Sequence, residues 1–271
     1  MIPGAFCVSY GIWQLRRNSP MRVIQARISR YVYDGGIMGI VLGARLATIA
    51  DMLGHFDTVA DIGSDHGRLA VALLQQKNAT RVIASDISAL SLNKARELSA
   101  NCGVEAQIDL RVADGLSGLT KGEADALVIA GMGGALIANI LAASVEITRS
   151  AKRIVMQPMR GTEDLRFYLH HNGFRILDER IVREAGRYYQ LIAACSGEPE
   201  PIPAWFPQGV YTYGWVTAQK RDPMLLPLLL KNRAGHLKRL ERAQKAGASP
   251  ETLLKELQKL DLLIGLMEDR H

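Results

Sequence analysis

The chain has 271 residues, of which 48% are hydrophobic and 22% charged, and its formal net charge is +6. This length can hold one substantial core with a smaller appendage. The basic surplus is weak evidence for a nucleic-acid partner, because residues 1–37 carry five arginines against Asp34 alone and hold most of that charge. Cys7, Cys102 and Cys195 form no pair pattern and no metal-ligand spacing. The composition thus argues against a disulfide framework and a metal centre, and favours a reducing cytoplasm.

The first 37 residues differ from the rest of the chain. They lack the continuous apolar core of a secretion signal, and their arginine-rich, acid-poor composition only faintly resembles a transit peptide. Met38 precedes the first segment that fits the fold described below. We therefore interpret residues 1–37 as an upstream extension of the true start or as a flexible tail.

The stretch at residues 59–67, Val-Ala-Asp-Ile-Gly-Ser-Asp-His-Gly, predicts a strand that turns through a glycine loop into a helix over Arg68–Gln76. Its G-x-x-x-G spacing is not the G-x-G-x-x-G of dinucleotide sites. Asp61 and Asp65 would repel a pyrophosphate at the helix N-terminus. They suit a ligand with cationic groups and sugar hydroxyls, such as S-adenosylmethionine. A plain strand-to-helix turn is the alternative.

Two further strands in the sequence also end near an acidic residue. Residues 81–86 form an apolar strand that ends in Asp86, close to the offset of about 20 residues at which an acid binds ribose hydroxyls. Ser88 is a suitable N-cap for the helix that follows. Residues 107–112 alternate as a third strand and lead to Asp114. This carboxylate either accepts a hydrogen bond from an adenine amino group or forms an Asx-turn.

Residues 126–145 contain no charged residue, and a run of that length could suggest a membrane span. The glycines in its middle argue against a span. A strand over residues 125–130, a Gly-Met-Gly-Gly turn and a helix over residues 135–143 explain the same residues.

The next segments complete a sheet. Residues 152–157 predict a fifth strand closed by Pro158, and residues 162–172 predict a helix. Residues 174–183 and 187–195 are two longer strands joined by a short turn, which adds an antiparallel hairpin to the sheet. Five β–α units followed by a hairpin are the expected shape of a class I methyltransferase domain.

Four motifs occur in order: Asp-Ile-Gly-Ser-Asp-His at 61–66, Ala-Gly-Met-Gly-Gly at 130–134, Gln-Pro at 157–158 and Gly-Arg-Tyr-Tyr-Gln-Leu-Ile at 186–192. With them the chain, from about residue 45 to residue 194, resembles the bacterial tRNA adenine methyltransferases that modify N1 of adenine 22 in the D-arm. The resemblance implies an α/β fold: a Rossmann-like domain with a mainly parallel seven-stranded sheet that ends in an antiparallel hairpin, and a C-terminal helical coiled-coil hairpin. It also implies S-adenosyl-L-methionine as cofactor and tRNA as partner, with no membrane and no metal.

Site residues follow from these motifs. Asp65 is the candidate catalytic residue: it either orients the adenine amino group and takes up its proton, or supports the cofactor. We expect His66 to hydrogen-bond the cofactor or backbone rather than to act as a base. The predicted cofactor-binding residues are Asp61, Gly63, Ser64, His66, Asp86, Ile87, Asp114, Gly115, Gly131 and Met132.

The family's Gln-Pro-Asn motif is changed here, because Met159 stands where the asparagine would be. If that asparagine contacts the target base, Gln157 or Arg160 must replace it. The target adenine has to be unpaired or flipped, since pairing occupies its ring nitrogen. Aromatic residues between the last strand and the C-terminal helices either stack on bases or form an interdomain core: Tyr188, Tyr189, Trp205, Phe206, Tyr211, Tyr213 and Trp215.

The C-terminal part has a different composition. Pro199, Pro201, Pro203 and Pro207 mark residues 199–223 as a linker between the methyltransferase domain, residues 38–198, and a helical domain, residues 224–271. Apolar residues at four-three spacing predict an antiparallel coiled-coil hairpin whose seam is formed by Leu226, Leu230, Arg233, Leu237, Leu240 and Gln244 on the first helix and by Leu253, Leu257, Leu260, Ile264 and Met267 on the second.

The first of these helices is rich in basic residues, which either bind an RNA backbone or are simply solvated. The candidates for substrate binding are Lys231, Lys238, Arg239 and Arg242, in addition to Gln157 and Arg160. Three functions remain in view: methyl transfer to N1 of a tRNA adenine, methylation of another RNA or a small molecule, and a non-catalytic protein that binds the cofactor and docks RNA or another partner.

Overall fold

The computed structural model describes residues 31–34, 37–207, 211–246 and 249–269. The interpretation of residues 1–37 as an extension or tail therefore lies largely outside the described residues. The strands are β1 (Tyr31–Asp34), β2 (Ile37–Ile40), β3 (Phe56–Ile62), β4 (Ala79–Asp86), β5 (Ile108–Val112), β6 (Ala126–Gly133), β7 (Arg153–Arg160), β8 (Phe174–Glu184) and β9 (Arg187–Ser196). The α-helices are α2 (Ala44–Leu53), α3 (Arg68–Gln75), α4 (Ala89–Asn101), α5 (Gly134–Ala143), α6 (Val145–Ser150), α7 (Thr162–His171), α8 (Trp215–Gln219), α9 (Leu225–Lys245) and α10 (Glu251–Glu268).

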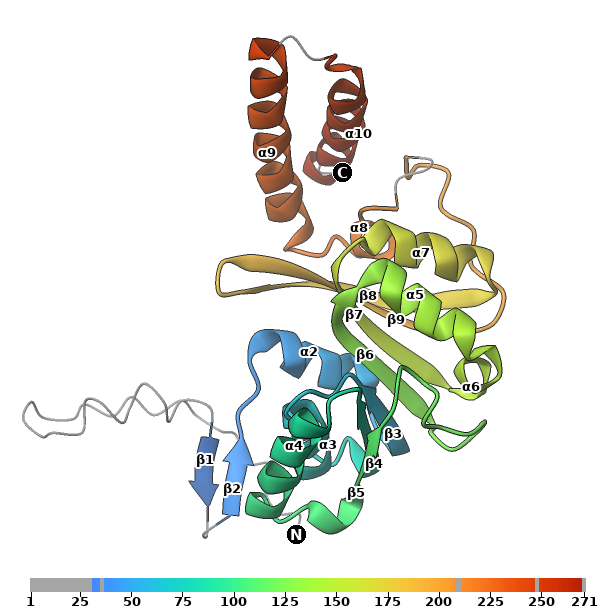
Figure 1. The fold of residues 1–271 in the computed structure, drawn as a ribbon. Coiled ribbons are helices and arrows are strands. Elements are labelled where there is room, and N and C mark those ends of the chain that lie inside the picture. Colours follow the sequence, from blue (N-terminus) through green and yellow to red (C-terminus); the bar gives the residue numbers. More distant parts are fainter. Residues whose placement is uncertain (1–30, 35–36, 208–210, 247–248, 270–271) are drawn as a thin grey trace, which may run out of the picture.

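The central sheet has seven strands in the order β5-β4-β3-β6-β7-β9-β8. The pairs among β3 to β7 are parallel, and β9 runs antiparallel to both β7 and β8. The order reverses between β4 and β6, on either side of β3, which is where open α/β sheets bind ligands. The predicted fold, with its terminal antiparallel hairpin, is confirmed (Figure 1).

Helices cover both faces of the sheet because neighbouring strand residues point to opposite sides. Val59, Val82 and Val128 pack with α2 and α3, whereas Ile83 and Ile129 pack with α5 and α7 on the other face. All five side chains are fully buried. The uncharged stretch at 126–145 is thus a buried strand followed by a helix, and within the described residues no helix is long and apolar enough to cross a bilayer.

Two strands extend further than predicted. We expected a turn at residues 131–134, but β6 continues through an irregular step at Met132 to Gly133. We expected Pro158 to end β7, yet the strand reaches Arg160. Pro158 lies opposite Met132 at that irregular step, beyond Met156, where pairing with β9 stops. A proline is tolerated at such an irregular, partly unpaired position because no regular ladder hydrogen bond is lost.

The segment between β9 and α9 packs tightly against the transferase domain. Phe206, Tyr213 and Trp215 are buried in the core that α5 and α7 share with the C-terminal helices, and Trp205 remains exposed. Arg166 of α7, itself fully buried, donates to Tyr211 O and Thr212 O and pairs with Glu179 of β8 at 2.6 Å. Most of these aromatic side chains therefore form an interdomain core, which was one of the two predicted alternatives.

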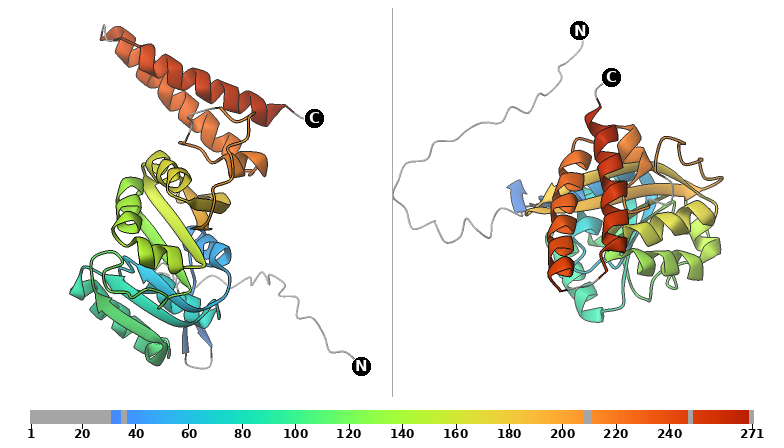
Figure 2. Two further views of the ribbon diagram at one scale, coloured as in Figure 1. Left: turned by 90° about the vertical axis from the view of Figure 1, so that its right-hand side faces the viewer. Right: turned by 90° about the horizontal axis from the view of Figure 1, so that it is seen from above.

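Helices α9 and α10 form an antiparallel hairpin that projects from the sheet (Figures 1 and 2). The predicted seam on α10 is confirmed at its centre, since Leu257, Leu260 and Ile264 are buried. The predicted seam on α9 is wrong at two of its leucines: Leu230 is 45% and Leu237 36% exposed.

The polar residues Asn232 and His236 occupy the α9 seam instead. Asn232 Nδ2 donates to the Tyr213 hydroxyl at 2.7 Å, and His236 Nδ1 lies 3.1 Å from Glu256 Oε2. Arg233, which we placed in the seam, pairs with Asp261 of α10 at 2.6 Å. The inward face of α9 therefore begins with the buried Leu225, Leu228 and Leu229 and continues with these polar side chains.

Candidate active site

A cavity of about 880 Å³ opens at the carboxyl ends of the parallel strands. Its volume lies in the range of small-molecule and cofactor sites, about 300–1,000 Å³. The ends of β3, β4 and β6, the loop after β5, the start of α2 and the tip of β8 all contribute to its walls. It brings together Asp65 and every residue predicted to bind the cofactor: Asp61, Gly63, Ser64, His66, Asp86, Ile87, Asp114, Gly115, Gly131 and Met132.

Asp61 is the most buried acid of this cavity, with 4% of its surface exposed. Burial raises its pKa to about 6; a hydrogen bond from the Ser64 hydroxyl, at 2.7 Å, opposes the rise, and the nearby Asp86 carboxylate adds to it. A buried carboxylate beside a second carboxylate is stabilised in its ionised form by a cation. The cavity therefore favours a positively charged ligand at the end of β3.

Asp86 fixes the glycine loop to the end of β4. Its Oδ2 accepts the backbone N–H of Asp65 at 3.0 Å, and its Oδ1 accepts that of Ser88 at 2.8 Å. Ser88 caps α4 as predicted, by accepting the N–H of Ser91. The Asp86 carboxylate is thereby held at the mouth of the cavity, and each of its oxygens keeps a lone pair for a hydroxyl group.

Asp114 lies on the same side of the cavity, in the loop after β5. An Asx-turn would require its side chain to accept a backbone N–H. Among the described residues its carboxylate accepts no hydrogen bond, whereas its backbone oxygen accepts Ser117 N at 3.1 Å. Of the two predicted alternatives, the geometry therefore favours a carboxylate available to a ligand.

Two glycines are required near the cavity, Gly63 by its backbone conformation and Gly134 by close approach to another backbone. Gly63 has φ +72°, and a Cβ there would lie 2.2 Å from Met132 Cε. A Cβ on Gly134 would lie 1.8 Å from the carbonyl oxygen of Gly161. The turns after β6 and β7 can thus approach each other, and Met132 can pack on the glycine loop.

Asp65 occupies a strained backbone position at the cavity rim, with φ 52°. Its Oδ1 accepts the Ser91 hydroxyl at 3.3 Å and lies 3.0 Å from His66 Nδ1. Because the Asp86 carboxylate accepts the backbone N–H of Asp65, the two residues lie at the same end of the cavity. Its catalytic role stays a prediction.

The structure adds cavity residues that the sequence did not indicate. Arg45 and Glu184 line the wall, although 139 positions separate them. Glu184 Oε2 accepts the backbone N–H of Arg45 at 2.8 Å and so caps α2, whose own N-cap residue, Gly43, has no side chain to do so. Arg45 Nη1 donates to Gln157 Oε1 at 2.6 Å. No local sequence signal connects these residues, because the contact depends on the tip of the β8–β9 hairpin.

The predicted substrate residues fall into separate places. Gln157 is fully buried, and its amide donates to Pro158 O while its oxygen accepts from Arg45. Arg160 is exposed at the end of β7. The remaining candidates, Lys231, Lys238, Arg239 and Arg242, are exposed on α9. Of the two candidates to replace the missing asparagine, only Arg160 is thus open to a substrate.

Comparison with known proteins identifies the family. Residues 42–192 match the family described as a methyltransferase domain. The tRNA (adenine(22)-N(1))-methyltransferase of Bacillus subtilis (strain 168) is 36% identical over 157 residues, which are 58% of this chain and 66%, just under two thirds, of that protein.

Solved structures show the same likeness over more of the chain. The structure of the B. subtilis m1A22 tRNA methyltransferase has 29% identity and a TM-score of 0.68, covering 84% of this chain and 97% of that one. A Streptococcus pneumoniae protein assigned as a tRNA (m1A22) methyltransferase, in complex with S-adenosyl-L-methionine, has 25% identity and a TM-score of 0.73, covering 83% and 100%. With the motifs, the sheet order and these matches in agreement, the chain belongs to the methyltransferase-domain family and is similar to the bacterial tRNA (adenine(22)-N(1))-methyltransferases.

Proposed function

We propose that this protein transfers a methyl group from S-adenosyl-L-methionine to N1 of adenine 22 in the D-arm of tRNA. The observation that carries the proposal is the cavity at the switch point of the sheet, where Asp61, Asp86 and Asp114 lie at the ends of three adjacent strands and suit a cationic nucleoside ligand. The named activity of the B. subtilis relative supplies the substrate and the position.

The residues present fit the cofactor. Asp61 would hold its cationic amino acid part, because a positive charge there compensates a carboxylate whose pKa burial raises to about 6. Asp86 would bind the ribose hydroxyls. Asp114 would accept a hydrogen bond from the adenine amino group, with Ile87 beside it on the cavity wall.

The reaction depends more on aligning the reacting atoms than on activating the nucleophile. When bound, the cofactor supplies a methyl group on a sulfonium, and the lone pair of adenine N1 forms the new N–C bond as the C–S bond breaks and its electrons return to sulfur. The chain must hold nucleophile, carbon and sulfur in line and exclude a paired adenine. Methylation leaves a positive charge on the ring, which makes the amino proton acidic. Asp65 would orient that amino group or take up its proton, or it would act indirectly, by holding the cofactor through Asp86.

The direct test is transfer of labelled methyl groups to unmodified bulk bacterial tRNA, followed by nucleoside analysis. We expect 1-methyladenosine, and we expect none on a transcript in which adenine 22 is replaced by guanine. Equal transfer to both transcripts would contradict the proposed position. Cofactor binding without any transfer would favour another RNA, a small molecule or a non-catalytic role.

Asp65→Ala tests the residue assignment. Loss of turnover by about 10²–10⁴-fold with unchanged cofactor affinity would support proton transfer. A parallel loss of cofactor affinity would support the indirect role, because the Asp65–Ser91 contact belongs to the cofactor end of the cavity. Unchanged turnover would remove Asp65 from the site.

The domain organisation fits this function and stays a prediction. Residues 38–198 would form the transferase domain, residues 199–223 the linker and residues 224–271 the helical domain that meets RNA. A tRNA substrate also fits the predicted cytoplasmic location. Among the described residues, no group of three or more His, Cys, Asp or Glu side chains is placed to hold a metal ion.

A further inference from the structure

The β8–β9 hairpin extends beyond the sheet. Strand β9 pairs with β7 only from Ile192 to Ala194, whereas β8 and β9 stay paired as far as Glu184 and Arg187 at the tip. The tip lies between α2 on one side and the base of α9 on the other (Figure 1). Because side chains alternate along a strand, the tip presents a different set of residues to each of these neighbours.

One face of the tip belongs to the cofactor cavity. Glu184 lines that cavity and caps α2, and Tyr189, on the same face, lies with its ring centroid 5.7 Å from the Arg45 guanidinium carbon. Val182, opposite Tyr189 in the register, packs in the core beneath α2. This face is therefore occupied by contacts within the domain.

The other face carries Arg183 and Tyr188, which lie directly opposite each other in the register. The guanidinium carbon of Arg183 lies 5.7 Å from the Tyr188 ring centroid, and Lys231 Nζ of α9 lies 5.1 Å from it. One aromatic ring thus gathers two cations from segments nearly fifty positions apart, through cation–π contacts. Hydrogen bonds anchor the base of the hairpin, where Ile181 N donates to Asp222 Oδ2 at 3.1 Å.

The two cations have no acidic partner. Within the described part of the chain, neither Arg183 nor Lys231 pairs with a carboxylate or donates a hydrogen bond, and both are exposed. Arg187 at the tip is exposed too, but it lies opposite Glu184 in the register and therefore on the cavity face. Unpaired donors held in place by a ring are suited to an anionic ligand, because most of the ordering cost is already met.

A row of cations continues from this point along α9. Lys231, Lys238, Arg242 and Lys245 follow one another at intervals of seven, four and three, which places them on one face of a helix. At 1.5 Å per residue the row is about 21 Å long, enough for several successive phosphates. Arg239 lies off the row, and its Nη2 is 2.9 Å from His236 Nε2.

We propose that Arg183 and Lys231 form a phosphate clamp for the RNA strand next to the target adenine. This inference rests on the proposed function, and it assigns to the hairpin a role in holding substrate. The partner is an RNA backbone, because the clamp continues a linear cationic row and because Glu184, the residue after Arg183, forms the wall of the methyl-transfer cavity. Phosphates held by the clamp would belong to nucleotides adjacent to the one that enters the cavity. Tyr188 is a positioning residue that keeps the two cations together.

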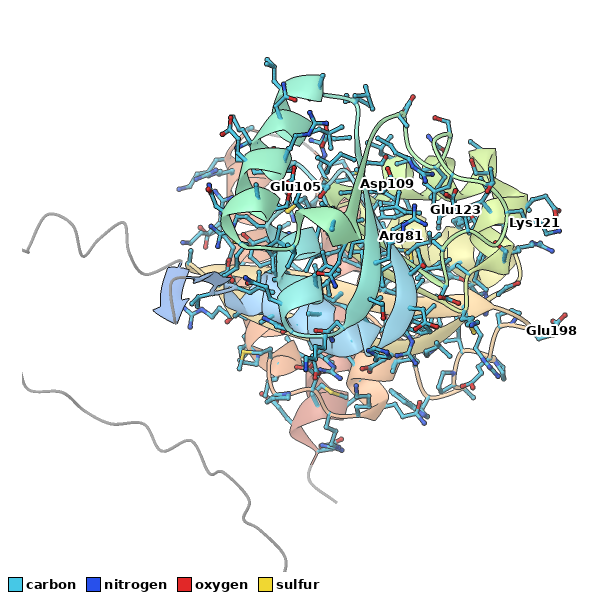
Figure 3. All side chains as sticks on the ribbon, turned by 90° about the horizontal axis from the view of Figure 1, so that it is seen from below. Arg81, Glu105, Asp109, Lys121, Glu123 and Glu198 are labelled. Carbon is cyan, nitrogen blue, oxygen red and sulfur yellow. The ribbon has the colours of Figure 1, made fainter. Side chains whose placement is uncertain are left out.

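The test is the salt dependence of tRNA affinity in an Arg183→Gln/Lys231→Gln variant. The matched control is Lys94→Gln/Lys121→Gln, which removes the same charge from α4 and from the loop between β5 and β6, where Figure 3 labels Lys121. The logarithm of the tRNA affinity falls linearly with the logarithm of the salt concentration. Each lost phosphate contact makes this line shallower by about 0.7–0.9. We therefore expect the clamp variant to lower the slope by about 1.5 and to weaken binding by about tenfold or more at moderate salt.

The control should keep the wild-type slope. Cofactor affinity and the melting temperature should be unchanged in both variants, and Tyr188→Leu should give a smaller loss of affinity that Tyr188→Phe restores. A clamp variant that binds tRNA like the control would overturn the clamp. Wild-type protein that binds no tRNA would overturn both the clamp and the proposed function; wild-type protein that methylates tRNA while the two double variants behave alike would overturn the clamp alone.

Discussion

Cations at two ends of the molecule have different partners. At the β5 edge, shown from below in Figure 3, the labelled cations have acidic partners: Arg81 pairs with Asp109 at 2.9 Å and Lys121 with Glu146 at 2.7 Å. At the hairpin tip and along α9, Arg183 and Lys231 contact an aromatic ring instead. Within the described residues, Arg81 and Lys121 are therefore paired with acids, whereas Arg183 and Lys231 are not, and the net charge of the chain does not reveal this difference.

The paired end is organised for stability. Arg111 binds Asp109 at 2.7 Å and Glu123 at 2.6 Å, and its hydrogen bonds lower the pKa of both acids, that of Glu123 to about 2. Such acids contribute stability at neutral pH. Unpaired cations at the other end contribute no such term, and this makes them available to a polyanion. The comparison predicts that mutations at the two ends separate stability from RNA binding.

The largest expected effect is at the buried ion pair. Arg166→Met removes the cationic partner of the fully buried Glu179, and we expect a loss of about 3–5 kcal/mol in the free energy of unfolding. The same substitution at the exposed Arg183 should change stability by less than about 0.5 kcal/mol. Chemical denaturation of both variants tests the difference, and a loss of similar size at both sites would contradict it.

Asp61→Asn, in contrast to Arg166→Met, should increase the free energy of unfolding at pH 7. Because the folded pKa of about 6 exceeds the unfolded value of 3.8, Asp61 stabilises the fold below pH 3.8, and this contribution is lost as the pH rises through about 6. At pH 7 the cofactor-free variant should be more stable than wild type by roughly 2–3 kcal/mol, and the gain should disappear near pH 4.

The same variant should bind the cofactor about tenfold to a hundredfold more weakly, because a charge-assisted contact is lost. Wild-type cofactor affinity should also fall as the pH drops below about 6. Calorimetric titration at several pH values, together with thermal unfolding, measures both effects. A variant that is destabilised at pH 7, or whose cofactor affinity is unchanged, would contradict the role of Asp61.

Local sequence signals predicted the parts of the site that lie at strand ends. Asp61 and Asp86 lie at the ends of β3 and β4, and Asp114 follows β5 by two residues, so parallel pairing alone brings them to one edge of the sheet. The cap at Ser88 was predictable for the same reason, because it depends on residues within one helical turn.

Contacts between distant segments were not predictable. The Arg45–Glu184 contact depends on how far the hairpin extends beyond β7, which neither strand's sequence states. On α9, the leucine spacing indicated the wrong seam because Asn232 and His236 find polar partners in Tyr213 and Glu256. The position of Pro158 within β7 depends on the irregular step in the neighbouring β6.

An effect of intermediate size on stability is expected at the β5 edge, where the cations are paired with acids. Arg111→Gln should lower the free energy of unfolding by about 1–2 kcal/mol at pH 7, because Asp109 and Glu123 lose their charged partner. The pKa of Glu123 is depressed, so this loss should shrink as the pH falls from about 4.5 towards about 2. The affinity for tRNA should stay at the wild-type value. Weaker tRNA binding by this variant would mean that paired cations also meet RNA.

The smallest expected effects on tRNA affinity come from single cations of α9. They test whether Lys238 and Arg242, which belong to the cationic row, differ from Arg239, which does not. Lys238→Gln and Arg242→Gln should each weaken tRNA binding by a few-fold, about 0.5–1 kcal/mol, and lower the salt slope by about 0.7–0.9. Arg239→Gln removes the same charge one position along the chain from Lys238, yet its guanidinium is directed to His236. It should therefore change the slope by less than either of the other two. If all three variants lowered the slope equally, RNA would be held by the diffuse charge of α9 rather than by a row that leads to the hairpin tip.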